Sequence, residues 1–335
     1  MPRKTKEEMY INNVFMNSRR CLKESQESLS PYSKKEISMK NPNTGLNEPV
    51  MEITHAINWC LKNHVKNWRT TTWRIMRSSY KFVLQLMVTN GRLKQEQVDK
   101  IYEVMLSVKG VSKKDTRVKY TASKRKKSIS EDEYELIKSY LDSHGNDWGE
   151  SLVLWLKAGM LTGLRPNEWV TALLTKEDEK YLLKTDNFKH NIDRSYDKDR
   201  VINITSFSQQ DLLIVANQIE MAKKITEQGM YDQYYDGCRN LLYRLNKKLF
   251  PRRKKNLQLY TGRHQFSANA KADDSVSEKE RAAMMGHKTT KTSEEGYGRK
   301  SSGTSGKSPE IANKAVLDKI NQPENKFNPQ KIKPV

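Results

Sequence analysis

Four residues of this sequence are of the types needed to break a phosphodiester bond without a metal ion. They are Arg165, Arg263, His287 and Tyr297, and they follow one another along the chain in that order. Arginine stays charged and can hold two phosphate oxygens through its planar fork. Tyrosine becomes a nucleophile when its phenol loses its proton, which neighbouring positive charges favour. The four residues therefore predict attack on a phosphate by a tyrosine that becomes covalently attached.

The local sequence places each candidate in a turn or near the start of a helix. Arg165 precedes Pro166, which suits the first position of a helix. Arg263 lies near the expected start of another helix, where a bound anion would be favoured. His287 follows Gly286, and Tyr297 comes ten positions later. Taken singly, each has an ordinary explanation: a helix cap, a surface ion pair or a structural histidine.

The composition indicates a polyanionic partner. The chain has 61 Lys+Arg against 40 Asp+Glu and a net charge of +21, which favours double-stranded DNA first and an acidic membrane second. We expect no membrane partner, because no apolar run is long enough to span a bilayer and no apolar signal core follows Met1–Lys6. Three widely spaced cysteines are typical of reduced thiols in a cytoplasmic protein and predict no zinc site, with a redox switch as the alternative.

Composition and breaker residues divide the chain into five segments. Residues 1–45 are a polar, basic arm, either a helix that contacts DNA or a disordered extension. Residues 46–109 are a small helical domain, and 110–128 form a basic linker. Residues 129–300 form a second, mostly helical domain. Residues 301–335 are a polar tail.

The hydrophobic pattern predicts a mainly α fold with a small antiparallel sheet. Three helices are expected between residues 46 and 108 from apolar spacing of three and four. In the second domain a capping box at Ser130 opens a helix, and residues 151–161 are apolar on nearly all sides, which indicates a central helix. Further elements are expected at 181–183 and 201–204 (strands), and around 211–227, 234–250 and 311–320 (helices).

Basic side chains that could contact DNA phosphates fall into three groups. The first lies on the expected helical domain, the second in the linker and the third shortly before Tyr260. The alternative is a solvated linker for the second group and a solvated loop for the third. The candidates are Arg69, Arg74, Arg77, Lys124, Arg125, Lys126, Lys127, Arg252 and Arg253.

The ordered motifs resemble those of the tyrosine recombinases, or phage-type integrases. The three blocks are Arg165 with Glu168, the Tyr260-x-x-Arg263-His264 box, and Gly286-His287 with Tyr297. Each block alone is weak, but the set in this order is specific, and it looks most like integrases of mobile elements. The resemblance covers about residues 46–300 and implies a helical core-binding domain followed by a catalytic domain.

The resemblance implies a role for each motif residue. Arg165 and Arg263 would clamp the scissile phosphate, and Tyr297 would attack it to leave a 3′-phosphotyrosine and a free 5′-hydroxyl. His287 would hydrogen-bond the phosphate or help to move the phenolic proton, and Glu168 would support this network. No metal and no other cofactor is implied.

A lysine in a β-hairpin would protonate the leaving oxygen in this family. Lys189 fits best, Lys184 ranks second, and Lys198 is a further alternative. The sequence departs from the family at Tyr260, where histidine or lysine is usual. A phenol can bind a phosphate oxygen but cannot supply a charge, and the neighbouring His264 could compensate.

The implied function is site-specific recombination through a Holliday junction in a homotetramer. It implies a prokaryotic, phage or mobile-element setting at the cytoplasmic nucleoid, with accessory DNA-bending proteins as possible partners. A telomere resolvase or type IB topoisomerase would share the chemistry, and a non-catalytic DNA-binding regulator would share only the fold. The tail could dock on a neighbouring protomer or pack on its own chain.

Overall fold

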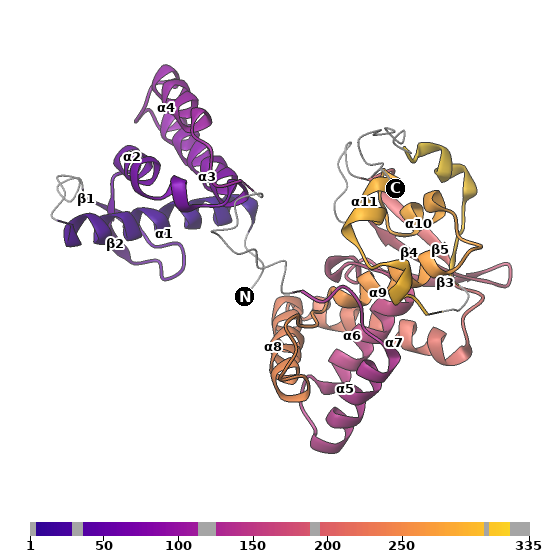
Figure 1. Cartoon of the computed structure of the whole chain (residues 1–335). Coiled ribbons are helices and arrows are strands. Elements are labelled where there is room, and N and C mark those ends of the chain that lie inside the picture. The colour runs from indigo at the N-terminus through magenta and orange to yellow at the C-terminus, as the bar shows by residue number, and fades with distance from the viewer. Residues whose placement is uncertain (1–4, 29–35, 113–124, 188–194, 305–307, 322–335) are drawn as a thin grey trace, which may run out of the picture. The chain divides into compact units, whose positions relative to one another are not determined.

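The computed structural model describes residues 5–28, 36–112, 125–187, 195–304 and 308–321. The chain divides into an N-terminal unit, Arg3–Tyr120, and a C-terminal unit, Thr121–Val335, each with its own hydrophobic core. The fold is mainly α with a small antiparallel sheet, as the sequence predicted (Figure 1).

The N-terminal unit is a helical bundle with one β-hairpin. Its first helix packs against the third, and the second strand of the hairpin lies against the first helix. Trp59 and Trp73 are buried in the cores of this unit. Its elements are α1 (Lys6–Glu27), β1 (Glu36–Lys40), β2 (Asn47–Met51), α2 (Ile53–Asn63), η2 (Val65–Asn67), α3 (Thr70–Thr89) and α4 (Gln95–Ser107).

The first 45 residues differ from the expected separate arm. Helix α1 opens with a capping box, in which Thr5 and Glu8 exchange hydrogen bonds of 2.7 and 3.1 Å. Its buried face combines Val14 and Phe15 with small side chains such as Ser18. Small and polar residues on this face lower its apparent hydrophobicity, which is why the sequence favoured an arm. The described part of the segment is instead packed within the N-terminal unit.

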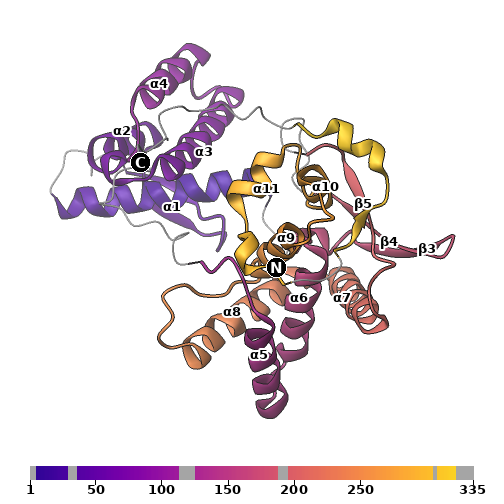
Figure 2. The same cartoon turned by 45° about the vertical axis from the view of Figure 1, so that its right-hand side comes forward.

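The C-terminal unit is built around one buried helix, α6 (Gly149–Thr162). Leu152, Trp155 and Leu156 are buried along it, and its neighbours are α5, α7, α8 and α9 (Figure 2). The central position predicted for residues 151–161 is therefore confirmed. The other helices are α5 (Glu131–His144), α7 (Gln209–Glu227), α8 (Tyr231–Leu249), α9 (Thr261–Ala272), α10 (Glu278–Met284) and α11 (Thr290–Gly296), with short 3-10 turns η4 (Pro166–Glu168), η5 (Lys300–Ser302) and η6 (Lys314–Lys319).

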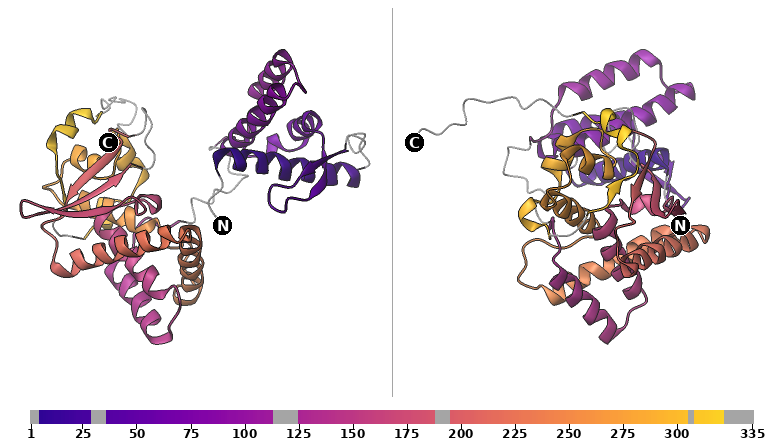
Figure 3. Two further views of the ribbon diagram at one scale, coloured as in Figure 1. Left: turned by 180° about the vertical axis from the view of Figure 1, so that it is seen from behind. Right: turned by 90° about the vertical axis from the view of Figure 1, so that its right-hand side faces the viewer.

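An antiparallel sheet lies beside α10, at the opposite end of this unit from α5 and α8 (Figure 3). Its strands run in the order β3 (Leu173–Glu177), β4 (Lys180–Asp186), β5 (Asp199–Asn203) and β6 (Glu310–Ile311). The buried pair Leu183 and Ile202 sets the register of the two middle strands. The strands predicted at 181–183 and 201–204 are confirmed, and β3 and β6 were not predicted.

The helix predicted for residues 311–320 is wrong. Ile311 pairs with Ile202 as part of β6, and only the 3-10 turn η6 follows. Ile311 and Ile320 are buried against Ala282 of α10, so burial of these two side chains outweighs the local helical preference. This segment packs on its own chain in the structure, and residues 322–335 lie outside the described range.

Deletion of a central side chain tests this core. Leu156→Ala should lower the free energy of unfolding by about 2–5 kcal/mol, because it leaves a cavity at the centre of the unit. Chemical denaturation followed by circular dichroism measures the loss. Leu213→Ala makes the same deletion on α7 at a side chain that is 60% exposed, and it should change stability by less than about 0.5 kcal/mol. Equal losses in the two variants would contradict the central place of α6.

Candidate active site

A buried carboxylate gathers three arginines in the C-terminal unit. Glu168, at the end of η4, is fully buried. It accepts hydrogen bonds from the Arg165 side chain and, at 2.6 Å, from the Arg165 backbone N–H. Both terminal nitrogens of Arg200 also bond it, at 3.2 and 2.7 Å, and Arg263 Nη1 lies 3.7 Å from Oε2. Three guanidinium groups against one carboxylate leave an excess of positive charge, which favours an anion.

The charge state of Glu168 follows from its neighbours. Burial by itself would raise the pKa of this carboxyl group, but the charges of Arg200, Arg263 and Arg165 outweigh burial and hold the pKa well below its usual range. Glu168 is therefore an anion at neutral pH. As an anion it can accept hydrogen bonds from all its donors and fix where the arginines lie.

Backbone carbonyls join the two motif arginines to each other. Arg263 donates to the carbonyls of Gly163 and Met285, and Arg165 Nη2 donates to the same Met285 carbonyl at 3.4 Å. Gly163 ends α6 in a left-handed conformation with φ +66°. A Cβ there would lie 2.4 Å from the Phe266 ring, so only glycine fits.

The Gly-His motif is a tight turn after α10. Gly286 has a φ of +63°, and a Cβ on it would lie 2.1 Å from Asn187 Oδ1 and 2.7 Å from Arg200 Nη1. The turn directs the Met285 carbonyl towards the arginines and brings His287 to the same place. This explains why the histidine follows a glycine.

His287 is held as a neutral base. Burial and the charges of Arg263, Arg165 and Arg200 lower its pKa well below the usual value. Its Nε2 lies 3.2 Å from Arg263 Nη2. Because arginine has only donors, Nε2 must accept, and the ring proton is then on Nδ1.

Tyr297 completes the cluster from the segment that follows α11. Its hydroxyl lies 3.3 Å from His287 Nε2, 3.4 Å from Arg263 Nε and 2.9 Å from the Tyr260 hydroxyl. Burial raises the pKa of Tyr297, but the Arg263 charge, the Tyr260 hydrogen bond and the Arg165 charge together lower it to about 8. The phenol is thus more acidic than ordinary tyrosine.

The His264 ring packs close to the nucleophile candidate, Tyr297. Its ring centroid is 5.1 Å from that of Tyr297 and 5.3 Å from that of Tyr260. Burial and the charges of Lys127, Arg263 and Arg125 lower its pKa to about 4. His264 is therefore neutral at physiological pH and packs beside the two phenols.

Two polar residues of the cluster were missed by sequence reasoning. Arg200 is buried on β5, and its Nη1 donates to Asn187 Oδ1 at 2.8 Å. A signal was present, because Arg200 alternates with the inward-facing Ile202 and Ile204. No comparable local signal marks Asn187, which follows β4 and also donates to the carbonyls of Asp197 and Asp199.

The lysine candidates for the general acid fall in or near the segment after β4. Lys189 lies outside the described residues, two positions beyond Asn187. Lys184 is on β4 and pairs with Glu177 of the adjacent strand. Lys198 is exposed, and its carbonyl accepts from the Asn187 backbone at 2.7 Å.

The basic residues predicted to contact DNA occupy three kinds of position. Arg69 is buried in the N-terminal unit. Lys126 and Arg253 are half-buried and both pair with Glu133. Lys124 lies outside the described residues, Arg77 is half-buried, and the exposed members are Arg74, Arg125, Lys127 and Arg252.

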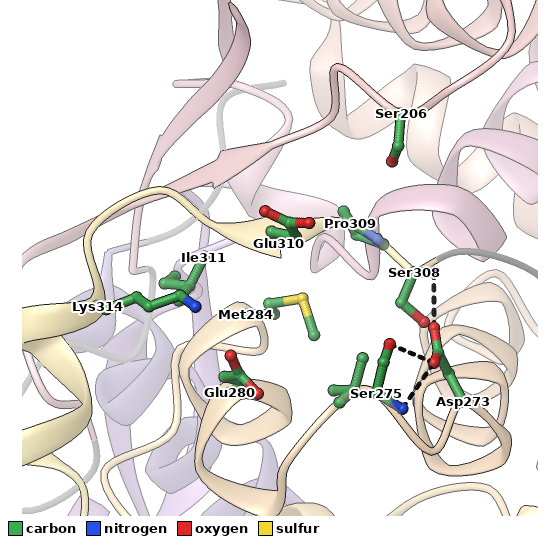
Figure 4. Close-up of a pocket in the computed structure, with 11 residues that line it drawn as sticks. Ser206, Asp273, Ser275, Glu280, Met284, Ser308, Pro309, Glu310, Ile311 and Lys314 are labelled. Carbon is green, nitrogen blue, oxygen red and sulfur yellow. Dashed lines mark hydrogen bonds between the residues drawn. The ribbon is translucent and has the colours of Figure 1, made fainter.

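A cavity of about 280 Å³ lies apart from these residues, between α10 and the segment that includes β6 (Figure 4). Among the described residues that line it are three carboxylates, Asp273, Glu280 and Glu310, and one cation, Lys314. Asp273 accepts hydrogen bonds from Ser275 and from the Ser308 backbone. The negatively charged lining of this cavity makes it unsuited to bind a phosphate.

Within the described ranges, no group of three or more His, Cys, Asp or Glu side chains could hold a metal ion. The helices in those same ranges are all too short or too polar to cross a membrane.

Comparison with known proteins adds structural relatives only. No protein-family model matches the sequence, and no curated protein matches it. Among solved structures, the chain is similar to the Tn1549 transposon integrase in complex with a circular intermediate DNA, at 13% identity and a TM-score of 0.36 over 73% of this chain and 81% of that one.

Two recombinases are also similar. The XerA recombinase is 14% identical, with a TM-score of 0.34 over 84% of this chain and 92% of that one. The XerH site-specific recombinase, bound to its difH substrate before cleavage, is 14% identical, with a TM-score of 0.34 over 88% and 96%.

Loss of the shared carboxylate should destabilise the C-terminal unit in a pH-dependent way. Glu168→Gln keeps the shape of the side chain but leaves buried arginines uncompensated, which should cost about 3–5 kcal/mol at neutral pH. Because the folded-state pKa lies below the ordinary value of about 4.3, the carboxylate stabilises fully above that pH and progressively less below it. Denaturation at a series of pH values should show that the difference in the free energy of unfolding between wild type and variant becomes smaller in acid.

Glu177→Gln is the matched control, since Glu177 forms its ion pair with Lys184 at an exposed site. It should change stability little at any pH. A difference between wild type and Glu168→Gln that widens as the pH falls would contradict the direction of the pKa shift.

Proposed function

We propose that this chain is a tyrosine recombinase that cuts and rejoins double-stranded DNA. The supporting observation is the convergence of Arg165, Arg263, His287 and Tyr297 from four separate segments. Arg165 and Arg263 share the Met285 carbonyl, and Arg263, His287 and Tyr297 lie within 3.2 to 3.4 Å of one another at their polar atoms. A protein that only bound DNA would not need a phenol at the centre of this cluster.

The reaction follows from the charges of these groups. The Tyr297 oxygen attacks phosphorus, a phosphorus–tyrosine bond forms, and the bond to the 5′-oxygen breaks. Arg165 and Arg263 would stabilise the negative charge that develops on the non-bridging oxygens. Arg165 Nε is buried and has no hydrogen-bond partner within the described part of the chain. The 3′-phosphotyrosine conserves the bond energy, so rejoining needs neither ATP nor metal.

Two protons must move during cleavage. The Tyr297 phenol loses one, and its lowered pKa makes this feasible near neutral pH. His287 can accept a hydrogen bond from the Tyr297 hydroxyl. Its own low pKa means that it does not retain the proton. The leaving 5′-oxygen gains a proton, for which we propose Lys189. Asn187, two positions before Lys189 in the sequence, accepts a hydrogen bond from Arg200 of the cluster.

The DNA surface would include the exposed cations Arg74, Arg125, Lys127 and Arg252, with phosphate contacts dominating affinity. We propose that Lys126 and Arg253, which pair with Glu133, instead hold the linker end against the segment after α8.

The assembly proposed for the full reaction is a homotetramer on two DNA sites. Strand exchange would pass through a Holliday junction and would serve integration or excision of a mobile element at the cytoplasmic nucleoid, with accessory DNA-bending proteins as possible partners.

Removal of the nucleophile is the direct test. Tyr297→Phe deletes one hydroxyl without changing charge, so it should abolish covalent attachment to DNA and leave binding nearly unchanged. Incubation with a nicked suicide duplex followed by a denaturing gel measures the adduct, and a mobility-shift assay measures binding.

Three other outcomes would each have a distinct meaning. An adduct with Tyr297→Phe would contradict the nucleophile assignment. Binding without any adduct in the wild type would indicate a non-catalytic regulator. Cleavage and religation without exchange between two sites would indicate a topoisomerase or a telomere resolvase.

The general acid can be tested separately from the arginines. Lys189→Ala should slow cleavage of ordinary DNA severely, because the 5′-oxygen then leaves without a proton. With a 5′-bridging phosphorothiolate the leaving thiolate needs no acid, so the variant should recover most of its rate. Arg263→Ala should recover little, since its task concerns the non-bridging oxygens.

Rescue of Lys184→Ala or Lys198→Ala in place of Lys189→Ala would move the acid to another lysine. If no lysine variant is rescued, His264 is the next residue to test, although its low pKa argues against it.

A further inference from the structure

Tyr260 and Tyr297 form a pair of phenols that meet at their hydroxyls. The two oxygens are 2.9 Å apart, within the range of a good O–H···O hydrogen bond. Tyr260 caps the start of α9, whereas Tyr297 follows α11, so the contact joins segments 37 positions apart. Both side chains are half-buried. The contact is therefore built by the fold and not by chain proximity.

We infer that Tyr260 activates and positions the nucleophile, by donating a hydrogen bond that holds Tyr297 as the attacking phenolate. This inference rests on the proposed function and adds a role for a residue that the family resemblance assigned to the phosphate.

The charges around the pair decide which hydroxyl donates. Arg263 can only donate, and its Nε lies 3.4 Å from the Tyr297 oxygen. It therefore favours negative charge on Tyr297. A phenolate has no proton to give, so the hydrogen of the shared bond must belong to Tyr260.

The acidities of the two phenols agree with this direction. Burial raises the pKa of Tyr260, and the charge on Tyr297 raises it further against the opposing effect of Arg263. The pKa of Tyr297 is instead lowered to about 8. One phenol therefore keeps its proton in the pH range where the other begins to lose it.

The remaining polar groups near Tyr297 do not replace this donor. His287 faces the Tyr297 hydroxyl with Nε2, which acts as an acceptor because Arg263 donates to it. His264 contacts it through ring packing. Lys127 donates to the Gly296 carbonyl at 2.9 Å. Arg165 acts on Tyr297 through its charge. Glu168 and Arg200 bond each other. Tyr260 is thus the neutral donor of the group.

Ultraviolet titration of the full chain without DNA tests this role independently of activity. Tyrosinate absorbs differently from tyrosine, so one of the 15 tyrosines should titrate near pH 8 in the wild type, and this step should be missing in Tyr297→Phe. In Tyr260→Phe the step should move up by about one pH unit, which is roughly a tenfold loss of phenolate at neutral pH.

Tyr234→Phe is the matched control. Its hydroxyl is also buried and bonded, to Gln218 at 3.1 Å, but lies in the core away from the cluster. This variant should leave the early step unchanged. An early step that persists in Tyr297→Phe, or that does not move in Tyr260→Phe, overturns the inference.

The pH dependence of adduct formation gives the second readout. Tyr260→Phe should form adduct about tenfold more slowly than wild type at neutral pH and approach it as the pH rises, because hydroxide then supplies the phenolate. A purely phosphate-binding role would slow the variant equally at every pH and overturn the inference. If the wild type forms no adduct, the proposed function fails, and the titration alone then decides whether the tyrosine pair exists.

Discussion

The candidate site depends on one buried negative charge. Glu168 has no exposed surface, and it neutralises one of three guanidinium groups drawn from η4, β5 and α9. Arginines of like charge cannot be buried together without such a partner. Within the described residues Glu168 is the one carboxylate bonded to these arginines, and we propose that the remaining positive charge serves to bind a phosphate. The carboxylate thus makes the cluster stable and gives it affinity for its proposed substrate at the same time.

Backbone groups connect the buried arginines to the rest of the site. A single carbonyl, that of Met285, accepts from both motif arginines, and the next two residues are the Gly286 turn and His287. The turn works only without a side chain, because Asn187 and Arg200 fill the space beside it. Displacement of any one of these groups would therefore disturb the others. The histidine and arginine motifs, far apart in sequence, are thus joined through the Met285 carbonyl and the turn that follows it.

A charged side chain and a neutral one at position 260 would act on different groups of the proposed site. Charge on Arg263 acts on both the nucleophile and the phosphate, but a neutral phenol at position 260 can act only through its proton. A histidine or lysine at that position could add a positive charge near the phosphate, whereas Tyr260 lies against the Tyr297 hydroxyl at 2.9 Å. We infer that the tyrosine at this position therefore acts on the attacking group and not on the substrate.

Sequence by itself determined the elements whose cause is local. The capping box of Ser130 and Glu133 joins residues three positions apart, and the apolar character of α6 is visible in its own sequence, so both patterns are readable directly. The motif order likewise identified the residues that the fold brings together. Only the tertiary structure decided that Arg200 joins the cluster, that residues 311–320 form a strand and a 3-10 turn, and that Arg253 pairs with Glu133. Each of these depends on partners far away in the chain, where burial and charge pairing outweigh local preference.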